Sequence, residues 1–198
     1  MPRITALKRE NIAEYEPLFQ QLEEFFGFVP NDYLTMGHKP HVMKAVNDLT
    51  GAIFFAPGKT PTPLRLLIAY LSSRSAQCMY CIAHCGSLAI EQGLPLEQIQ
   101  NITQYETHPS FSALERAALR IADKAGKTPN VVTDQDFNEL RQFFDDEACA
   151  ELVAVIALMG FYNRWNDTVA TSLEKSPMEN GLKFLKTTGW TAGKHASQ

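Results

Sequence analysis

The sequence predicts an all-α protein, and three observations support this. Apolar residues recur at the three-to-four-residue spacing of amphipathic helices along most of the 198-residue chain. No run of β-branched residues alternates with polar residues as a half-buried strand requires. Proline, glycine and hydroxyl residues stand where such helical stretches begin or end.

These start and stop signals divide the chain into helices. Pro17 suits a first helical turn, Gly27 suits a helix end, and Thr62-Pro63 combines a cap with a first-turn proline. The helix that begins at Thr62 is apolar around most of its circumference, so we expect it to be buried. A turn is expected at 28–31. The expected helices cover residues 16–26, 40–54, 62–71, a cysteine-containing segment that ends at 93–95, 95–102, 112–125, 133–144 and 147–173.

Length and composition fit one domain. A chain of 198 residues with 45% apolar content is long enough to bury a large core. We expect a single all-helical domain over 1–198. Its tail after Ser176 is expected to pack only in part, with 191–198 the loosest.

Charge and cysteine usage exclude several classes of protein. A formal charge of -4 without a long Lys/Arg run argues against nucleic-acid binding, so the expected partners are small molecules or proteins. No apolar signal segment or bilayer-spanning stretch is apparent, so no membrane partner is expected. Four cysteines, three of them crowded together, do not resemble a secreted disulfide framework. We therefore expect a cytoplasmic location.

The most informative motif groups Cys78, Cys81, His84 and Cys85 within eight residues. Two cysteines three apart on a helix share a face, near enough for a reversible disulfide. A helix N-terminus or a neighbouring base stabilises a thiolate there. If a new helix begins near Ser75, Cys78 gains this support; if the helix is continuous from Thr62, it does not. Redox chemistry is the first functional hypothesis.

Several segments carry a family resemblance. The pattern Cys-x-Tyr-Cys-x-x-His follows a buried helix, and further matching segments lie at 26–31, 112–120, 132–134 and 161–167. With them the chain resembles the carboxymuconolactone decarboxylase and alkylhydroperoxidase D superfamily, in its peroxidase-related branch, over about 16–190. The resemblance implies an all-α fold of two similar helical halves. It also implies assembly into trimers or hexamers, with the thiol pair at the mouth of a pocket near a subunit boundary.

The resemblance also implies a redox activity. Redox members of the superfamily reduce a hydroperoxide, or pass electrons, by cycling a CxxC pair, which Cys78 and Cys81 match. One thiolate attacks the peroxide, the other condenses with the sulfenic acid, and an external dithiol restores the pair. Which cysteine attacks first stays open. The expected function is a thiol-disulfide oxidoreductase or antioxidant peroxidase without a cofactor or metal.

The chain departs from the family pattern at the proton relay. The family has a glutamate twelve residues before the first cysteine and a histidine seven after it, whereas this chain has Leu66 and Cys85. These departures predict a weakened peroxidase. His84 is the candidate to replace the relay as a base or charge partner of Cys81, or else it makes a structural hydrogen bond.

Other residues near the motif have two interpretations each. Cys85 either competes for the disulfide or is a small buried hydrophobe. Arg74 either lowers a thiol pKa from the preceding turn or is solvated or paired with a carboxylate. Tyr80 projects to the opposite side of the helix from the thiols, which favours packing. Cys149 is expected in the core. Three polar residues either border a pocket or tie helices together: Asn163, Arg164 and Asp167.

Four other functions compete with the redox hypothesis, and the sequence argues against the first three. A zinc site from Cys78, Cys81 and His84 or Cys85 lacks a second Cys/His pair downstream. A c-type haem attachment needs histidine where Ile82 stands. Lactone decarboxylation belongs to relatives without the cysteine pair. The fold can also serve as a non-redox small-molecule-binding or assembly protein, which the changes at the relay positions favour.

Overall fold

The computed structural model describes residues 2–196, and within them every regular element is helical, which confirms the all-α class. The α-helices are α1 (Glu16–Phe26), α2 (Asn31–Met36), α3 (Pro40–Phe54), α4 (Thr62–Ser75), α5 (Met79–Glu91), α6 (Leu96–Gln100), α7 (Ala113–Ala125), α8 (Asp134–Leu140), α9 (Asp146–Val169) and α10 (Lys175–Asn180). Among these helices, none combines the length and the apolarity needed to cross a bilayer.

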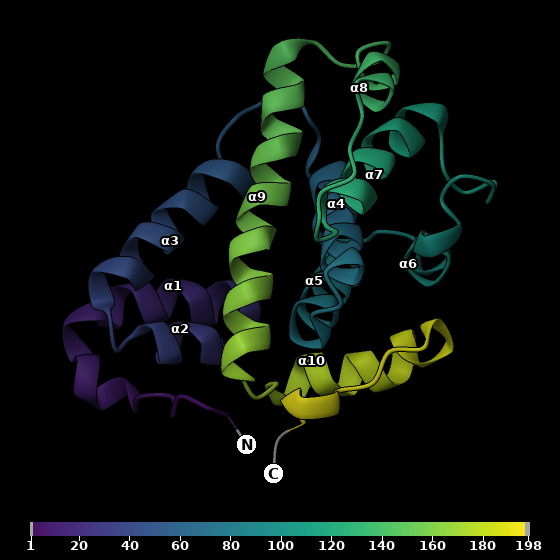
Figure 1. Cartoon of the computed structure of the whole chain (residues 1–198). Coiled ribbons are helices and arrows are strands. Elements are labelled where there is room, and N and C mark those ends of the chain that lie inside the picture. The colour runs from purple at the N-terminus through teal and green to yellow at the C-terminus, as the bar shows by residue number, and fades with distance from the viewer. Residues whose placement is uncertain (1, 197–198) are drawn as a thin grey trace.

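The long helix α9 organises the fold. It runs through the middle of the molecule, with α1, α2 and α3 on one side and α4, α5 and α7 on the other (Figure 1). Each side has its own apolar core: a large one around α4, α5 and α7, and a smaller one in which α1, α2 and α3 pack against α9. Helix α10 and the C-terminal segment lie below α5 and complete the larger core.

Helix α4 is buried, as its all-round apolar character predicts. It packs against α5, α7 and α9. Its one buried guanidinium, Arg65, donates to Thr60 Oγ1 at 2.8 Å and to the Ile53 carbonyl at 2.9 Å, and it pairs with Glu151. These partners compensate the charge of Arg65 where α4 passes through the core.

A break in the chain separates α4 from the cysteine helix. Helix α4 ends at Ser75, and Gln77 adopts a left-handed backbone conformation with φ of 58°, which is strained for a residue other than glycine. Cys78 then has an extended backbone and caps α5, whose first residue is Met79. The cysteine segment is therefore a new helix, and Cys78 occupies its N-cap position.

Several segments differ from expectation. Helices α8 and α9 end at Leu140 and Val169, before the expected ends at 144 and 173. The expected turn at 28–31 leads directly into α2, because Pro30 has the extended backbone of a helix N-cap and Asp32 lies in the first turn. The tail expected to be loose also forms α10 and a π-helical turn (Gly181–Leu185). Trp190 holds this tail, since its indole N–H donates to the Met79 carbonyl at 2.9 Å.

The end of the tail is also packed within the described range. Three residues from 193 to 195 form a 3-10 turn, and the His195 side chain is fully buried. The Leu173 N–H donates to the His195 carbonyl at 2.8 Å. The segment 191–198, expected to be the loosest, is thus fixed at His195, while 197–198 lie outside the described residues.

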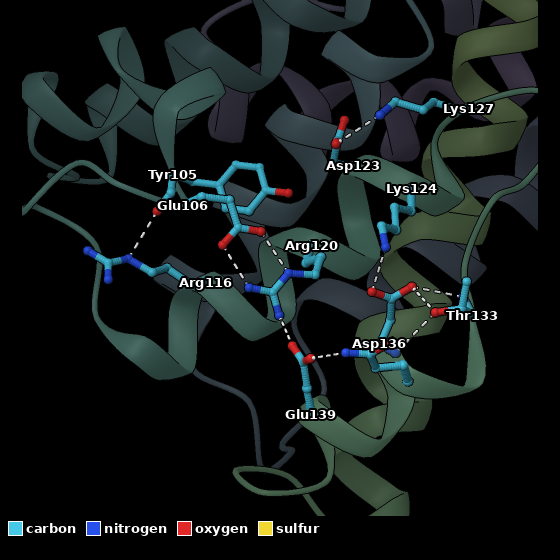
Figure 2. Close-up of polar contacts among 11 residues, drawn as sticks. Tyr105, Glu106, Arg116, Arg120, Asp123, Lys124, Lys127, Thr133, Asp136 and Glu139 are labelled. Carbon is cyan, nitrogen blue, oxygen red and sulfur yellow. Dashed lines mark hydrogen bonds and ion pairs between the residues drawn. The ribbon is translucent and has the colours of Figure 1, made fainter.

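Charged side chains tie α7 to α8 and to the preceding loop (Figure 2). Arg120 lies between Glu106 and Glu139, and Lys124 pairs with Asp136 at 2.6 Å. Asp136 also accepts from the Thr133 N–H in a capping box at the start of α8. This network fixes the far end of the domain and lies apart from the cysteine segment.

Gly181 allows the close approach of the tail to the Trp190 ring. A Cβ added at Gly181 would lie 2.5 Å from that ring, whereas one at Gly51 in α3 would meet nothing within 4 Å. We expect Gly181→Ala to lower the free energy of unfolding by about 1–3 kcal/mol through overpacking. Gly51→Ala should leave it unchanged or raise it by up to about 1 kcal/mol. Equal urea midpoints for the two variants would contradict this packing.

Candidate active site

A cavity of about 480 Å³ lies between α1, α3, α4, α5 and α9. Its wall is mostly apolar, with Leu66 of α4 and Met159 of α9 among the lining residues. Phe25 and Phe55 also line it, are exposed, and meet edge to face at 5.2 Å between ring centroids. These two rings therefore border its mouth. Cys81, His84 and Cys85 bring the α5 motif to this cavity.

The two CxxC cysteines lie close together but have different surroundings. Both are free thiols and buried, and they are near enough to hydrogen-bond to each other. Cys81 lines the cavity, whereas Cys78 is not among its lining residues. Burial, together with the neighbouring Cys78 and Cys85 thiols, raises the pKa of Cys81 well above its usual value. A small molecule in the cavity therefore meets Cys81.

Asn166 of α9 connects Cys81 to a buried carboxyl group. Its side-chain amide lies 3.1 Å from Asp32 Oδ2 and 3.6 Å from Cys81 Sγ. Burial raises the pKa of Asp32 to about 6, and the charge of Glu174 adds to this effect. The amide opposes the increase in the pKa of Cys81, because its N–H groups favour a thiolate.

His84 is paired with Glu174, which precedes α10. His84 Nε2 lies 2.6 Å from Glu174 Oε2, and the Tyr80 hydroxyl donates to Glu174 Oε1 at 2.8 Å. The backbone N–H of Asn31 donates to the same oxygen. The imidazole also stacks on the Tyr80 ring, with centroids 4.3 Å apart. His84 is therefore fixed in position at the cavity wall.

This pairing favours a protonated His84. Burial acts to lower the pKa of His84, but the attraction and hydrogen bond of Glu174, with Asp32 and Glu91 adding to them, outweigh burial and raise it. The same pair lowers the pKa of Glu174 despite its own burial. The pair thus favours the imidazolium form of His84 at the wall of the cavity that Cys81 also lines, and this is the form that donates a proton to a leaving group.

The residues around the motif fall into two groups. Tyr80, predicted to face away from the site, lines the cavity, because it lies one helical turn before His84 on the same face. Cys85 also lines it, and burial raises its pKa to about 12. Arg74 instead donates to Thr188, at 3.0 Å from both the hydroxyl and the carbonyl oxygen, so its contacts hold the tail.

The other residues singled out in the sequence lie in the core, at the cavity wall or around a second cavity. Cys149 is buried in the core, as predicted. Leu66, at the relay position, is buried and offers the cavity only an apolar surface. Asn163, Arg164 and Asp167 border a separate cavity of about 560 Å³, outside the wall that carries Cys81.

Three site residues were not predicted from the sequence. Asp32, Asn166 and Glu174 provide the polar contacts of the motif, and each comes from a different part of the chain. Asp32 and Asn166 lie in or next to segments that carry the family resemblance, which was a usable signal. Glu174 stands in a polar stretch with no distinguishing pattern, so only the fold reveals it.

Comparisons with known proteins agree with this geometry. A sequence profile of the Carboxymuconolactone decarboxylase family matches residues 40–124. The crystal structure of a cysteine-to-alanine variant of the debrominase Bmp8, in complex with 2,3,4-tribromopyrrole, superimposes with a TM-score of 0.85. It is 31% identical, over 91% of this chain and 96% of that chain.

Two further relatives are uncharacterized. A peroxidase-related protein from Ralstonia eutropha JMP134, an alkylhydroperoxidase AhpD core, has a TM-score of 0.78 and 26% identity, covering 89% of this chain and 94% of that chain. Protein YnjA of Escherichia coli (strain K12) is 24% identical over 144 residues, which are 73% of this chain and 79% of that protein.

Fold and site together define an AhpD-like protein with a CxxC motif at the start of a helix. The chain belongs to the carboxymuconolactone decarboxylase family.

The His84–Glu174 pair predicts a measurable titration. We expect Glu174→Gln to lower the pKa of His84, because the charge that opposes its desolvation is gone. Ring-proton NMR against pH measures this directly, with the exposed His41 as internal control.

The pH dependence of the free energy of unfolding provides a second readout of the His84–Glu174 pair. The folded-state pKa of His84 lies above its ordinary value of 6.5, so protonation of His84 stabilises the fold, and this contribution is fully present below pH 6.5 while Glu174 stays ionised. This contribution is lost as pH rises through the folded-state pKa. An unchanged His84 titration in Glu174→Gln would show that the pair does not control its charge.

Proposed function

We propose that this protein is a dithiol reductase that transfers two electrons from Cys78 and Cys81 to a small apolar hydroperoxide. The observation that carries the proposal is the position of Cys81, which lines an apolar cavity next to the His84–Glu174 pair. Cys78, its partner in the disulfide, lies within hydrogen-bonding distance. An external dithiol returns the pair to the reduced state.

The first step breaks the peroxide bond. The Cys81 thiolate attacks the terminal oxygen, so an S–O bond forms, the O–O bond breaks and the electron pair leaves on the alkoxide. The alkoxide takes a proton from His84 and becomes the alcohol, while the proton that Cys81 released restores His84. Cys81 is then a sulfenic acid.

The second step forms the disulfide. The Cys78 thiolate attacks the Cys81 sulfur, an S–S bond forms, and the S–O bond breaks. The departing hydroxide takes the Cys78 proton and becomes water. In total, one hydroperoxide and two thiols give one alcohol, one water and one disulfide.

The cavity wall indicates the kind of hydroperoxide. Aromatic and aliphatic side chains make up most of the lining, and its mouth is bordered by Phe25 and Phe55. Such a wall favours substrates with an apolar or aromatic body, because burial of apolar surface is the main source of binding free energy there. We therefore propose organic hydroperoxides as substrates ahead of hydrogen peroxide.

A second candidate substrate is a halogenated aromatic ring. The observation that favours it is the 31% identity, over nearly the full chain, to a debrominase whose crystal structure holds 2,3,4-tribromopyrrole. Here Cys81 would attack the halogen, the carbanion would take a proton from His84, and Cys78 would displace halide to form the disulfide. One aryl halide and two thiols give one arene, one hydrogen halide and one disulfide.

Serine variants test the dithiol cycle. Cys78→Ser and Cys81→Ser should each reduce the turnover of cumene hydroperoxide with a dithiol donor to the rate without protein, because neither variant can close the disulfide. Cys149→Ser, in the core away from the cavity, is the matched control and should retain turnover. Equal residual rates in all three variants would exclude the mechanism.

Removing the acid tests the role of His84. His84→Gln keeps a polar side chain of similar size but cannot donate a proton as an imidazolium does. We expect kcat/KM for the hydroperoxide to fall about 10²- to 10⁴-fold. The control is His41→Gln. A drop in His84→Gln no larger than in the control would assign His84 a structural role only.

Restoring the family relay distinguishes a weakened enzyme from a binding protein. Leu66 and Cys85 both line the cavity, so Leu66→Glu with Cys85→His places the missing groups there. We expect peroxide reduction to increase if the dithiol site is redox-active. If the wild type and this variant are both inactive toward hydroperoxides but the wild type releases bromide from 2,3,4-tribromopyrrole, the second candidate replaces the first.

A further inference from the structure

Cys78 has polar neighbours of its own, outside the cavity wall. Its sulfur, a carboxylate oxygen of Asp167 and a ring nitrogen of His195 all lie within 4.8 Å of one another. Asp167 belongs to α9 and His195 to the C-terminal segment, and neither lines the cavity that Cys81 faces. The two thiols of the motif therefore meet different polar groups.

The hydrogen bonds of His195 define which nitrogen is free. Its Nδ1 lies 2.8 Å from the Thr171 carbonyl oxygen, which only accepts hydrogen bonds, so Nδ1 carries the proton. Nε2 then holds the lone pair. This atom is buried without a hydrogen-bond partner and lies 3.9 Å from Asp167 Oδ1. Because buried polar atoms are normally paired, a free Nε2 close to the Cys78 thiol indicates a function.

The charges around His195 keep the ring neutral. Burial lowers its pKa, the nearby Lys194 ammonium acts in the same direction, and Asp167 and the Thr171 carbonyl oppose them without reversing the effect. Tyr80 also lies near the ring, with ring centroids 6.0 Å apart, and so does the Cys78 thiol. A neutral imidazole with a free nitrogen is a proton acceptor.

A cysteine, a histidine and a carboxylate are also a donor set for zinc. Here, however, Asp167 Oδ1 is already paired with the Lys194 ammonium at 2.7 Å. A second cation at the same oxygen would be repelled by this ammonium. The arrangement therefore suits a proton acceptor better than a metal ligand set.

We propose that His195, oriented by its hydrogen bond to the Thr171 carbonyl, accepts the proton of the Cys78 thiol at Nε2 and so prepares Cys78 for disulfide formation. The S–H bond of Cys78 breaks and an N–H bond forms at Nε2. The thiolate attacks the Cys81 sulfenic sulfur, and the imidazolium returns the proton to the departing hydroxide, which becomes water. The role of Cys78 in this cycle rests on the proposed function; the proton transfer itself does not.

The proton transfer is testable without any substrate. In the full chain with Cys81→Ser, Cys85→Ser and Cys149→Ser, Cys78 is the remaining thiol, and its thiolate is titrated by ultraviolet absorbance. We expect His195→Gln to move the midpoint upward by about one pH unit or more, a tenfold loss of thiolate at a given pH. The matched control His41→Gln should not move it. An unchanged midpoint in a folded His195→Gln protein would overturn the proposal.

A second measurement uses the unmodified protein, so it needs no folded variant. Nitrogen-15 NMR of the histidine rings in the unmodified reduced protein should show His195 protonated at Nδ1, with Nε2 free or sharing the Cys78 proton. A proton on Nε2 in the neutral ring would overturn the proposal, because that nitrogen would then be unable to accept one. If the unmodified protein does not turn over peroxide but His195→Gln still shifts the Cys78 titration midpoint, the proposed function is rejected and the proton transfer is not.

Discussion

The buried carboxylate of Glu174 is the contact on which the site depends. It accepts hydrogen bonds from the first residue of α2 and from Tyr80, and it pairs with His84. One side chain thus joins the N-terminal part of the fold, the cysteine helix and the C-terminal segment. Because a buried charge that loses its partner costs about 3–5 kcal/mol, these elements are held in a fixed arrangement around the cavity.

The break between α4 and α5 gives the two thiols different surroundings. A continuous helix would place both cysteines on one face toward one environment. Instead, the left-handed Gln77 leaves Cys78 at the N-cap, off the regular helical path, while Cys81 lies in the first turn. Cys81 then faces the cavity with His84 and Asn166, and Cys78 faces Asp167 and His195. The proposed dithiol cycle uses this division, because Cys81 must meet the substrate and Cys78 must then attack the Cys81 sulfur.

The sequence predicted helices and their bounds better than it predicted the site. Helices 16–26 and 40–54 match the structure because proline and glycine mark their ends by local backbone geometry. The motif indicated Cys81 and His84, and the structure places both at the cavity. Glu174 and His195 were not predicted, because their roles arise from tertiary packing of a segment without helical periodicity. Helix propensity and capping predict the backbone from neighbouring residues. The charge state of His84 instead depends on Glu174, which lies 90 residues away in the sequence.

We propose that Cys78 and Cys81 form one redox unit while Cys85 stays outside it. Disulfide mapping by mass spectrometry, after one equivalent of cumene hydroperoxide is added to the fully reduced protein without a donor, shows which thiols pair. We expect one Cys78–Cys81 disulfide and one equivalent of alcohol, with Cys85 and Cys149 still reduced. Alcohol formed with both motif thiols still reduced, or a disulfide that pairs Cys81 with Cys85, would contradict it.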